Sequence, residues 1–501
     1  MVMKSLLLII FLASTLISTL QFPLPTVQIT SAIPYDHGLV LTLEYVNFSS
    51  FNTKSQLVVC FVNSSMKYQM YSSTFNSISG IISTVLNGNL LVIVETENNG
   101  KPQAVIYNFT GLHFENYYTL NGLVLTREPP YYNLTYLSLI QYSKNQTNYT
   151  ILFPTDNVTF KDQLPALSLQ LPEGILVLTY NFSALSKSLV IPYNLTLLSS
   201  NGKVIWTRSY YLTYYTPQVL GLFSTVTNFA IIGDTLYLTN STVIKGSKIV
   251  VVKESLIAIS LSNGEIVNEM QITPNTVGLA NSNNTLYGIV VKNGHLIVQK
   301  YEEGKVINVV KTVFKERVIT KNITTPSGRV ITFNYTQPIT NVFVSDGKFI
   351  LVSTPGNVTV VDGNKVYSYT TSFEITRSLA PMVLLANESD NYYVVFLNPN
   401  GSIKAYYDLG EISTANVFGL NLVGVKVVKI SPGSYYVAYS EPSITGTQIN
   451  VYYVTFNKTT SIITTSITKT TSSSSSMFFI LIIAVVVIAV GVLVYINKKG
   501  F

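Results

Sequence analysis

Charged residues, cysteine, tryptophan and histidine are all scarce in this sequence, and each shortage excludes a class of protein. Only 11% of the 501 residues are charged, against a usual value of about 25%. A single cysteine, Cys60, allows no intramolecular disulfide, so the chain is not a disulfide-stabilised scaffold. Because Cys60 lies in the apolar run QLVVCFV, we expect a buried structural thiol, with a reactive thiol as the alternative.

The net charge of +7 does not indicate nucleic-acid binding. The 31 basic residues are dispersed along the chain, without a basic stripe or a recognition motif. The excess of positive charge reflects a shortage of carboxylates, of which there are only 24. Few carboxylates also mean few native ion pairs to lose on acidification, so the composition suits an acidic exterior.

No motif for catalysis or for cofactor binding is present. The three histidines, His37, His113 and His295, are far apart and have no metal-ligand spacing. The sequence contains no Gly-x-Ser-x-Gly, no phosphate-binding loop, no HExxH and no sialidase-type Asp box. We therefore expect no metal and no cofactor, and we name no catalytic residue. A pair of acids assembled by the fold stays open as an alternative.

What the sequence has in abundance is strand-forming residues separated by turns. Asn201-Gly202 stands between two apolar segments in LLSSNGKVIWTRSYYL, and this is a strong signal for a β-hairpin. The same pattern returns at Asn263-Gly264 and Asn400-Gly401. Looser versions lie near Ser64, Gly100, Gln146, Gly304, Gly363 and Gly446.

These nine hairpin centres are separated by 36 to 62 residues. A period of roughly 40–50 residues with several strands per unit is typical of a β-propeller. Because propellers usually have about four to eight blades, we predict an all-β propeller of seven or eight blades. One centre is then false, or the first strands after Gln21 join the last blade. The alternative is an N-terminal β-sandwich, about Gln21–Pro172, followed by a smaller propeller.

The two ends of the chain predict export and membrane anchoring. Residues 1–20 combine Lys4 with an apolar run, which indicates a signal peptide, cut between Ser14 and Gln21, or an uncleaved anchor. Met477–Ile496 is an uncharged run of 20 residues, long enough for one transmembrane helix. Lys498 and Lys499 place the tail, residues 497–501, in the cytoplasm.

Between these ends we expect an extracellular domain, residues 21–457, with an alternative sub-boundary near residue 172. A Ser/Thr-rich segment, residues 458–476, cannot bury a core and resembles a glycosylated stalk. Seventeen Asn-x-Ser/Thr sequons agree with exposure outside the cell. They are Asn47, Asn63, Asn108, Asn133, Asn145, Asn148, Asn157, Asn181, Asn194, Asn240, Asn283, Asn322, Asn334, Asn357, Asn387, Asn400 and Asn457.

Two tyrosine-rich segments, REPPYYNLTY and RSYYLTYYTP, are candidates for a binding rim, because tyrosine offers a large and rigid contact area. The alternative is that they are ordinary edge strands and loops. The candidate rim residues are Tyr131, Tyr132, Tyr210, Tyr211, Tyr214 and Tyr215.

The segments GDTLYL…LIAISLSNGEIV and LLSSNGKVIW resemble blades of the quinoprotein-type β-propeller family. Trp206 matches that family's tryptophan position, and Asn268 occupies the equivalent place in the second unit. The resemblance covers about residues 197–409 and implies the fold. The family's redox chemistry needs a vicinal cysteine pair, a stacking tryptophan and a calcium site, and this chain has no matching set.

The layout as a whole resembles surface glycoproteins of thermoacidophilic archaea. We expect a single-pass cell-surface protein with its propeller outside, which binds surface-layer, pilus, envelope-complex or glycan partners. The competing hypothesis is a surface glycan hydrolase with acids gathered at the propeller mouth. A third hypothesis is a subunit of a membrane redox complex. Fold alone decides none of these.

Overall fold

The computed structural model describes residues 13–22, 27–49, 52–63, 68–125, 135–143, 146–153, 156–185, 188, 190–213, 227–245, 249–324, 330–345, 347–388, 391–398, 400–410, 414–417, 420–443 and 446–456. The chain divides into two units, Met1–Lys458 and Thr459–Phe501. The predicted stalk, transmembrane helix and cytoplasmic tail lie outside the described residues. Within the described ranges, no helix has both the length and the apolar character needed to cross a bilayer.

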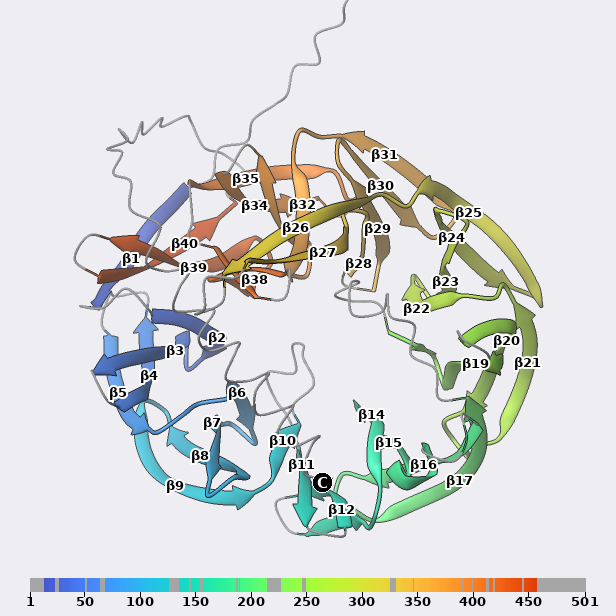
Figure 1. Ribbon diagram of the computed structural model, residues 1–501, viewed down its shortest axis with the longest axis horizontal. Coiled ribbons are helices and arrows are strands. Elements are labelled where there is room, and N and C mark those ends of the chain that lie inside the picture. The colour runs from blue at the N-terminus through green and yellow to red at the C-terminus, as the bar shows by residue number, and fades with distance from the viewer. Residues whose placement is uncertain are drawn as a thin grey trace, which may run out of the picture. The chain divides into compact units, whose positions relative to one another are not determined.

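The first unit is a β-propeller with nine blades, and each blade is a four-stranded antiparallel sheet (Figure 1). The prediction of a propeller is confirmed, whereas the prediction of seven or eight blades is wrong. All nine hairpin centres found in the sequence belong to different blades, so none of them was false. The usual range of blade numbers was therefore a poor guide to this chain.

Blades one to three follow directly along the chain. Blade one contains β2 (Val27–Tyr35), β3 (Gly38–Ser49), β4 (Asn52–Asn63) and β5 (Tyr68–Phe75). Blade two contains β6 (Gly80–Leu86), β7 (Asn89–Asn98), β8 (Lys101–Thr110) and β9 (His113–Asn121). Blade three contains β10 (Leu123–Leu125), β11 (Leu137–Ser143), β12 (Gln146–Leu152) and β13 (Asn157–Phe160).

Blades four to six continue the same order. Blade four contains β14 (Leu164–Leu171), β15 (Gly174–Tyr180), β16 (Val190–Ser199) and β17 (Val204–Thr213), with α1 (Phe182–Leu185) before β16. Blade five contains β18 (Phe229–Ile232), β19 (Thr235–Lys245), β20 (Ile249–Ser260) and β21 (Ile266–Ile272). Blade six contains β22 (Thr276–Ser282), β23 (Thr285–Lys292), β24 (His295–Glu302) and β25 (Lys305–Val313).

Two extra hairpins lie in the connections that precede blade seven and blade nine. Blade seven contains β28 (Asn341–Ser345), β29 (Phe349–Thr354), β30 (Asn357–Asp362) and β31 (Lys365–Thr370). Blade eight contains β32 (Glu374–Ala380), β33 (Val383–Glu388), β34 (Asn391–Leu397) and β35 (Ile403–Gly410). Blade nine contains β38 (Val425–Ser431), β39 (Ser434–Ser443), β40 (Gly446–Thr455) and β1 (Ala13–Phe22). The extra hairpins are β26 (Glu316–Thr324) with β27 (Val330–Pro338), and β36 (Thr414–Val417) with β37 (Leu420–Val423).

The two ends of the first unit meet in blade nine. β1 pairs antiparallel with β40, from Ala13 opposite Thr455 to Phe22 opposite Thr447. The first strands after Gln21 were expected to join the last blade, but they build blade one. The strand that completes the last blade lies before Gln21 for most of its length.

One apolar core lies at each of the nine seams between neighbouring blades. At the seam of blades one and nine, for example, Leu41 and Cys60 pack in one cluster with Ile449 and Val451. The other clusters join blades one to two, two to three, and so on to eight and nine. This arrangement overturns the alternative of an N-terminal sandwich, because residues 27–171 build blades of the same ring. Pro172 lies in the turn between β14 and β15.

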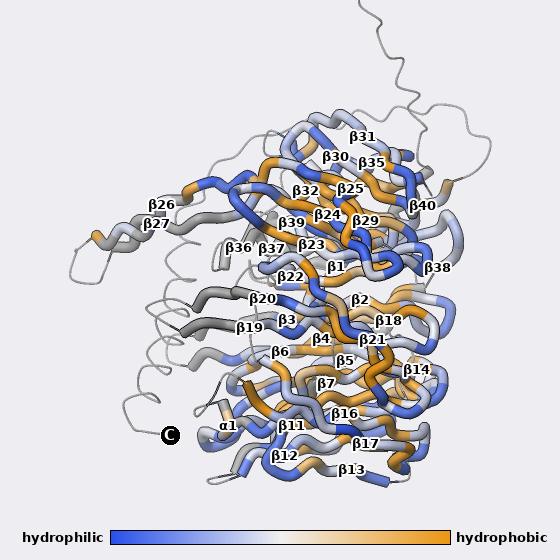
Figure 2. The backbone as a smooth tube through the Cα atoms, turned by 90° about the vertical axis from the view of Figure 1, so that its right-hand side faces the viewer, coloured by the Kyte–Doolittle hydropathy of each residue, from blue (hydrophilic) through white to orange (hydrophobic). Residues whose placement is uncertain are grey.

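The antiparallel order gives the ring two different faces. First-to-second and third-to-fourth turns emerge at one end, which we call the turn face; in blade six these are Asn283–Asn284 and Glu303–Gly304. The second-to-third and blade-to-blade connections emerge at the other end, which we call the insertion face. It carries α1 and both extra hairpins, and Figure 2 shows β26 and β27 extending beyond the blades on this side.

The seam of blades four and five shows why one glycine is required. The Trp206 ring lies against the Cα of Gly264, and its indole Nε1 donates a hydrogen bond of 2.9 Å to the Leu261 carbonyl. Gly264 has φ +73°, and a Cβ built there would lie 2.7 Å from Trp206 and Arg208 side-chain atoms. Both the backbone conformation and the space therefore favour glycine.

We predict that Gly264→Ala destabilises the propeller more than Gly294→Ala. Gly294 has a similar φ of +70°, but nothing lies within 4 Å of its built Cβ. Both changes cost left-handed backbone strain of about 1 kcal/mol, and only Gly264→Ala adds overpacking of about 1–3 kcal/mol. Chemical denaturation of the two variants measures the difference, and equal losses would show that the Trp206 contact is unimportant.

Candidate functional site

A groove of about 370 Å³ opens at the seam of blades six and seven, on the turn face. Two elements of blade six, β24 and β25, form one wall, and the turn between β30 and β31 forms the other. Its lining mixes charged, amide and apolar groups: Lys300, Glu302, Ile307, Asn308, Val309, Gly363, Asn364 and Val366.

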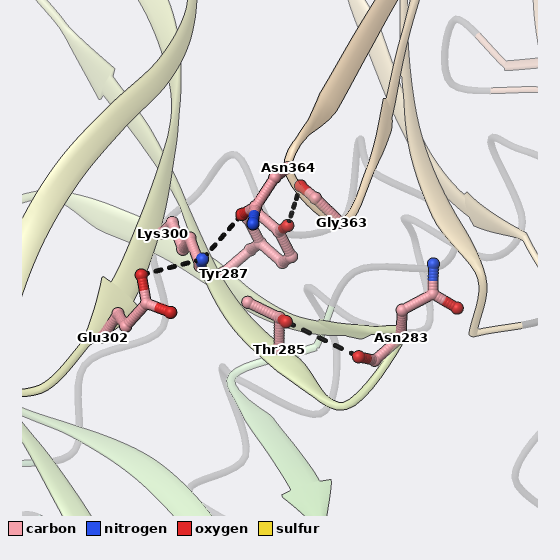
Figure 3. Close-up of polar contacts among 7 residues, drawn as sticks. All are labelled: Asn283, Thr285, Tyr287, Lys300, Glu302, Gly363 and Asn364. Carbon is pink, nitrogen blue, oxygen red and sulfur yellow. Dashed lines mark hydrogen bonds and ion pairs between the residues drawn. The ribbon is translucent and has the colours of Figure 1, made fainter.

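The charged end of the groove is ordered by contacts across the seam (Figure 3). Lys300 and Glu302 alternate with Tyr301 on β24, so their side chains share one face of the strand. Lys300 Nζ lies 2.8 Å from a Glu302 carboxylate oxygen, and it donates a hydrogen bond of 2.7 Å to Asn364 Oδ1. Lys300 is only 7% exposed, so its ammonium group has little access to water. Its position is therefore fixed by these two partners.

Further hydrogen bonds close the same seam from blade six to blade seven. Tyr287 donates through its hydroxyl to the Gly363 carbonyl at 2.5 Å (Figure 3). Asn283 Nδ2 donates to the Lys348 carbonyl at 3.0 Å and also to the Asp362 carboxylate. Burial raises the pKa of Tyr287, and the negative charges of Asp362 and Glu302 raise it further. The tyrosine therefore stays a hydrogen-bond donor over the physiological range.

Chemically, this groove offers one paired ammonium, one paired carboxylate and two side-chain amides. That set can orient a polar ligand by hydrogen bonds, but each charged group already has a partner. In the described part of the chain, no group of three or more His, Cys, Asp or Glu side chains is placed to hold a metal ion. The contacts most directly explain how blades six and seven are held together.

We predict that Lys300→Met destabilises the propeller by about 1.5–3 kcal/mol, since hydrogen bonds to charged groups contribute in that range. Methionine keeps the apolar stem of Lys300 buried and removes only the ammonium group. Lys305→Met is the matched control, because Lys305 is exposed at the neighbouring turn and the change in net charge is the same. Denaturant midpoints that fall equally in both variants would contradict the role given to the Lys300 contacts.

An aromatic cluster occupies the seam of blades one and two. Tyr71 on β5 stacks on Phe114 of β9, with ring centroids 4.8 Å apart and an interplanar angle of 24°. Tyr117, also on β9, lies 5.8 Å from the Tyr107 ring. The connected rings are Phe61, Tyr71, Phe75, Tyr107, Phe109, Phe114 and Tyr117.

The cluster is buried on one side and open on the other. Tyr107 is buried, and its hydroxyl donates to Ser73 Oγ at 2.8 Å. Tyr117 is 63% exposed and Phe114 is 38% exposed. The outer rings are therefore held by a rigid aromatic base while their own surfaces face solvent. We call Tyr71, Phe114 and Tyr117 the aromatic surface.

Sequence reasoning missed the aromatic surface because of a β-bulge. Phe114 pairs with Phe109 and Tyr117 pairs with Tyr107, and the register shifts between these pairs. The extra residue puts positions three apart on the same face, where regular alternation would place them on opposite faces. The aromatic residues of HFENYYTLN can be read from the sequence, but the bulge that aligns them cannot.

The six predicted rim tyrosines are not seen as one surface. Tyr210 and Tyr211 are neighbours on β17; Tyr210 is buried and donates to the Gly264 carbonyl, whereas Tyr211 is 72% exposed. Tyr131, Tyr132, Tyr214 and Tyr215 lie outside the described residues. The described flanks of these two segments, Leu125 and Thr213, lie at the turn face and the insertion face respectively. The rim stays a prediction.

The sequons differ in how their side chains are placed. Asn157, Asn181, Asn283, Asn334, Asn357 and Asn400 are exposed, and Asn108, Asn148, Asn194, Asn240 and Asn387 are half-buried. Asn133, Asn145 and Asn457 lie outside the described residues, as do the side chains of Asn47, Asn63 and Asn322. Asn283 stands apart among the exposed ones, because its amide nitrogen is already hydrogen-bonded across a seam.

Cys60 and His295 occupy ordinary structural positions. Cys60 is fully buried, and burial raises the pKa of its thiol to about 12, which confirms the prediction of a structural thiol. His295 Nδ1 lies 2.9 Å from the Asn293 carbonyl in a turn.

One buried carboxyl group, Glu254, and two half-buried ones, Glu44 and Glu95, were not singled out by the sequence. Glu254 on β20 is only 3% exposed; it accepts hydrogen bonds from the Thr276 backbone N–H of blade six at 2.8 Å and from Ser241 Oγ at 3.1 Å. Burial raises the pKa of Glu254, although these hydrogen bonds oppose the shift. Burial also raises the pKa of Glu44 and of Glu95.

We predict that these groups make the propeller more stable at pH 4 than at pH 7. A raised pKa means that the folded state binds the proton more tightly than the unfolded state, so the gain is complete below the unfolded pKa. The gain is lost as the pH rises through the folded pKa. Glu254→Gln, which imitates the protonated form, should show a smaller loss of thermal stability between pH 4 and pH 7. The exposed Glu303→Gln is the control, and identical pH profiles would contradict the prediction.

Comparison with known proteins shows no matching family model and no matching curated protein. Solved structures similar to this chain include one described as a β-propeller domain. The β-propeller domain of the trilobed protease from Pyrococcus furiosus, described as having an open velcro topology, is 9% identical with a TM-score of 0.35, over 67% of this chain and 99% of that one. The acylaminoacyl peptidase of Pyrococcus horikoshii is 11% identical with a TM-score of 0.33, over 83% of this chain and 57% of that one. No activity follows from likenesses of this size.

Proposed function

We propose that this chain is a membrane-anchored, glycosylated cell-surface protein whose propeller binds a glycan or glycoprotein of the envelope. The aromatic surface of Tyr71, Phe114 and Tyr117 is the observation that carries the proposal. Exposed, clustered aromatic rings are uncommon on a soluble surface unless they contact something. Tyrosine and phenylalanine held rigidly also lose little conformational entropy on binding.

A glycan fits this surface for a chemical reason. The apolar C–H face of a sugar ring packs flat against an aromatic ring, and its hydroxyl groups need polar partners beside that ring. Tyr117 is 63% exposed, and its ring lies against Tyr107, whose hydroxyl is hydrogen-bonded to Ser73. The residues of this surface belong to β5 and β9, which Figure 1 shows as outer strands at the periphery of the ring, where a long envelope polymer has access.

Anchoring and export are supported by the sequence of the two ends. The Ser/Thr-rich segment 458–476 would separate the propeller from a membrane crossed by Met477–Ile496. Among the sequons, exposure favours Asn157, Asn181, Asn334, Asn357 and Asn400 as glycosylated positions. The packing of Trp206 against Gly264 across a seam supports the resemblance to quinoprotein-type blades.

The test is binding of the full chain, in mild detergent, to isolated cell envelopes before and after enzymatic removal of their glycans. We predict that the double change Phe114→Ala and Tyr117→Ala weakens binding at least about tenfold, since truncating central aromatic contacts costs more than about 1.4 kcal/mol. Tyr211→Ala is the matched control, because Tyr211 is a tyrosine on another blade that is at least as exposed as Tyr117. Loss of binding in Tyr211→Ala alone would favour the tyrosine rim, and unchanged binding in both would contradict the proposal.

A further inference from the structure

The closing strand of the ring is made from residues that the sequence assigns to an export leader. β1 runs from Ala13 to Phe22, whereas the leader was expected to be cut between Ser14 and Gln21. A cut in that interval removes part or nearly all of β1. The same residues cannot be discarded and also serve as the outer strand of blade nine.

Blade nine depends on β1 more than any other blade depends on a distant segment. Eight blades take all four strands from one continuous stretch of chain, but blade nine has only β38, β39 and β40 in its own stretch. β1 pairs with β40 through nine residue pairs, with one shift in register between Leu16 and Ser18. Without β1, the backbone of β40 is left as a ten-residue open edge, which is a liability for aggregation.

We propose that Ala13–Phe22 stays in the mature protein, so that any leader cleavage lies N-terminal to Ala13. β1 then closes the ring and clamps the strand from which the chain leaves the propeller. Ala13 pairs with Thr455, and Phe456 follows at once; its N–H donates to the Gly433 carbonyl at 2.9 Å. The role as a clamp for a membrane tether rests on the proposed function, whereas the retention of β1 does not.

The position of β40 explains how such a clamp works. β40 is hydrogen-bonded to β39 on one side and to β1 on the other. The centroid of the Phe456 ring lies 5.0 Å from the centroid of the Phe396 ring and 4.0 Å from Lys404 Nζ. When force is applied through residues after Phe456, β40 is held by hydrogen bonds to two neighbouring strands rather than to one. It therefore cannot be peeled from the ring as easily as an edge strand.

The first experiment is the intact mass and N-terminal sequence of the chain purified from membranes. An N-terminus at or before Ala13 is the expected result. An N-terminus between Ser14 and Phe22 would overturn the proposal. This result is independent of any binding measurement, so failure of the proposed function leaves it unaffected.

The second experiment tests the pairing by a disulfide in the full chain. Directly opposed residues of antiparallel strands have Cα atoms about 4.5–5.5 Å apart, within the range of about 4.4–6.8 Å that a disulfide needs. We expect Ala13→Cys with Thr455→Cys to cross-link, with a shift in non-reducing mobility. The control is Ala13→Cys with Gln448→Cys, because Gln448 pairs with Gln21 at the other end of β1.

Cys60 does not interfere, because it is fully buried and its thiol pKa is about 12. Cross-linking of the matched pair alone supports β1 as the closing strand. Retention of Ala13 without this cross-link, or equal cross-linking of both pairs, would overturn it.

Discussion

Burial of apolar side chains between neighbouring sheets is the constraint on which the whole ring depends. A strand inside a blade has two faces, and each face is covered by a different neighbour. On β23, Leu286 packs toward blade five, whereas Tyr287 and Ile289 pack toward blade seven. No blade can bury both faces alone, so the structure is stable only when the last seam, between blades nine and one, is also closed.

Polar contacts are added where the apolar cores end. On the turn face, Lys300, Tyr287 and Asn283 reach from blade six to backbone and side-chain groups of blade seven. On the insertion side of the neighbouring seam, Glu254 accepts a backbone hydrogen bond from Thr276. Buried groups of this kind must find partners, because an unpaired one would cost more than the bond contributes. The same burial favours the protonated form of Glu254, in keeping with a chain that carries few charges.

A β-bulge recurs between the third and the outer strand of several blades, and it has two different effects. Register shifts occur at this position in blades two, four, five, six, eight and nine. In blade four the bulge immediately precedes Trp206, whose ring packs into the seam against Gly264. In blade two it aligns Phe114 and Tyr117, whose rings remain exposed. The extra residue changes which side chains share a face, and the surrounding blade decides whether they pack or face solvent.

The sequence by itself determined the all-β class, the repeat and one hairpin in each blade, because turn chemistry and strand propensity are local. Asn201-Gly202 and Asn263-Gly264 are both third-to-fourth turns, and Cys60 is buried as its apolar neighbours indicated. The blade number, the closing strand β1, the groove at Lys300, the carboxyl of Glu254 and the aromatic surface were decided only in the tertiary structure. Each of these depends on a pairing between blades or on a shift in register. Residues such as Ala13 and Thr455, at opposite ends of the unit, become neighbours only because the ninth seam must be closed, and no local pattern records that requirement.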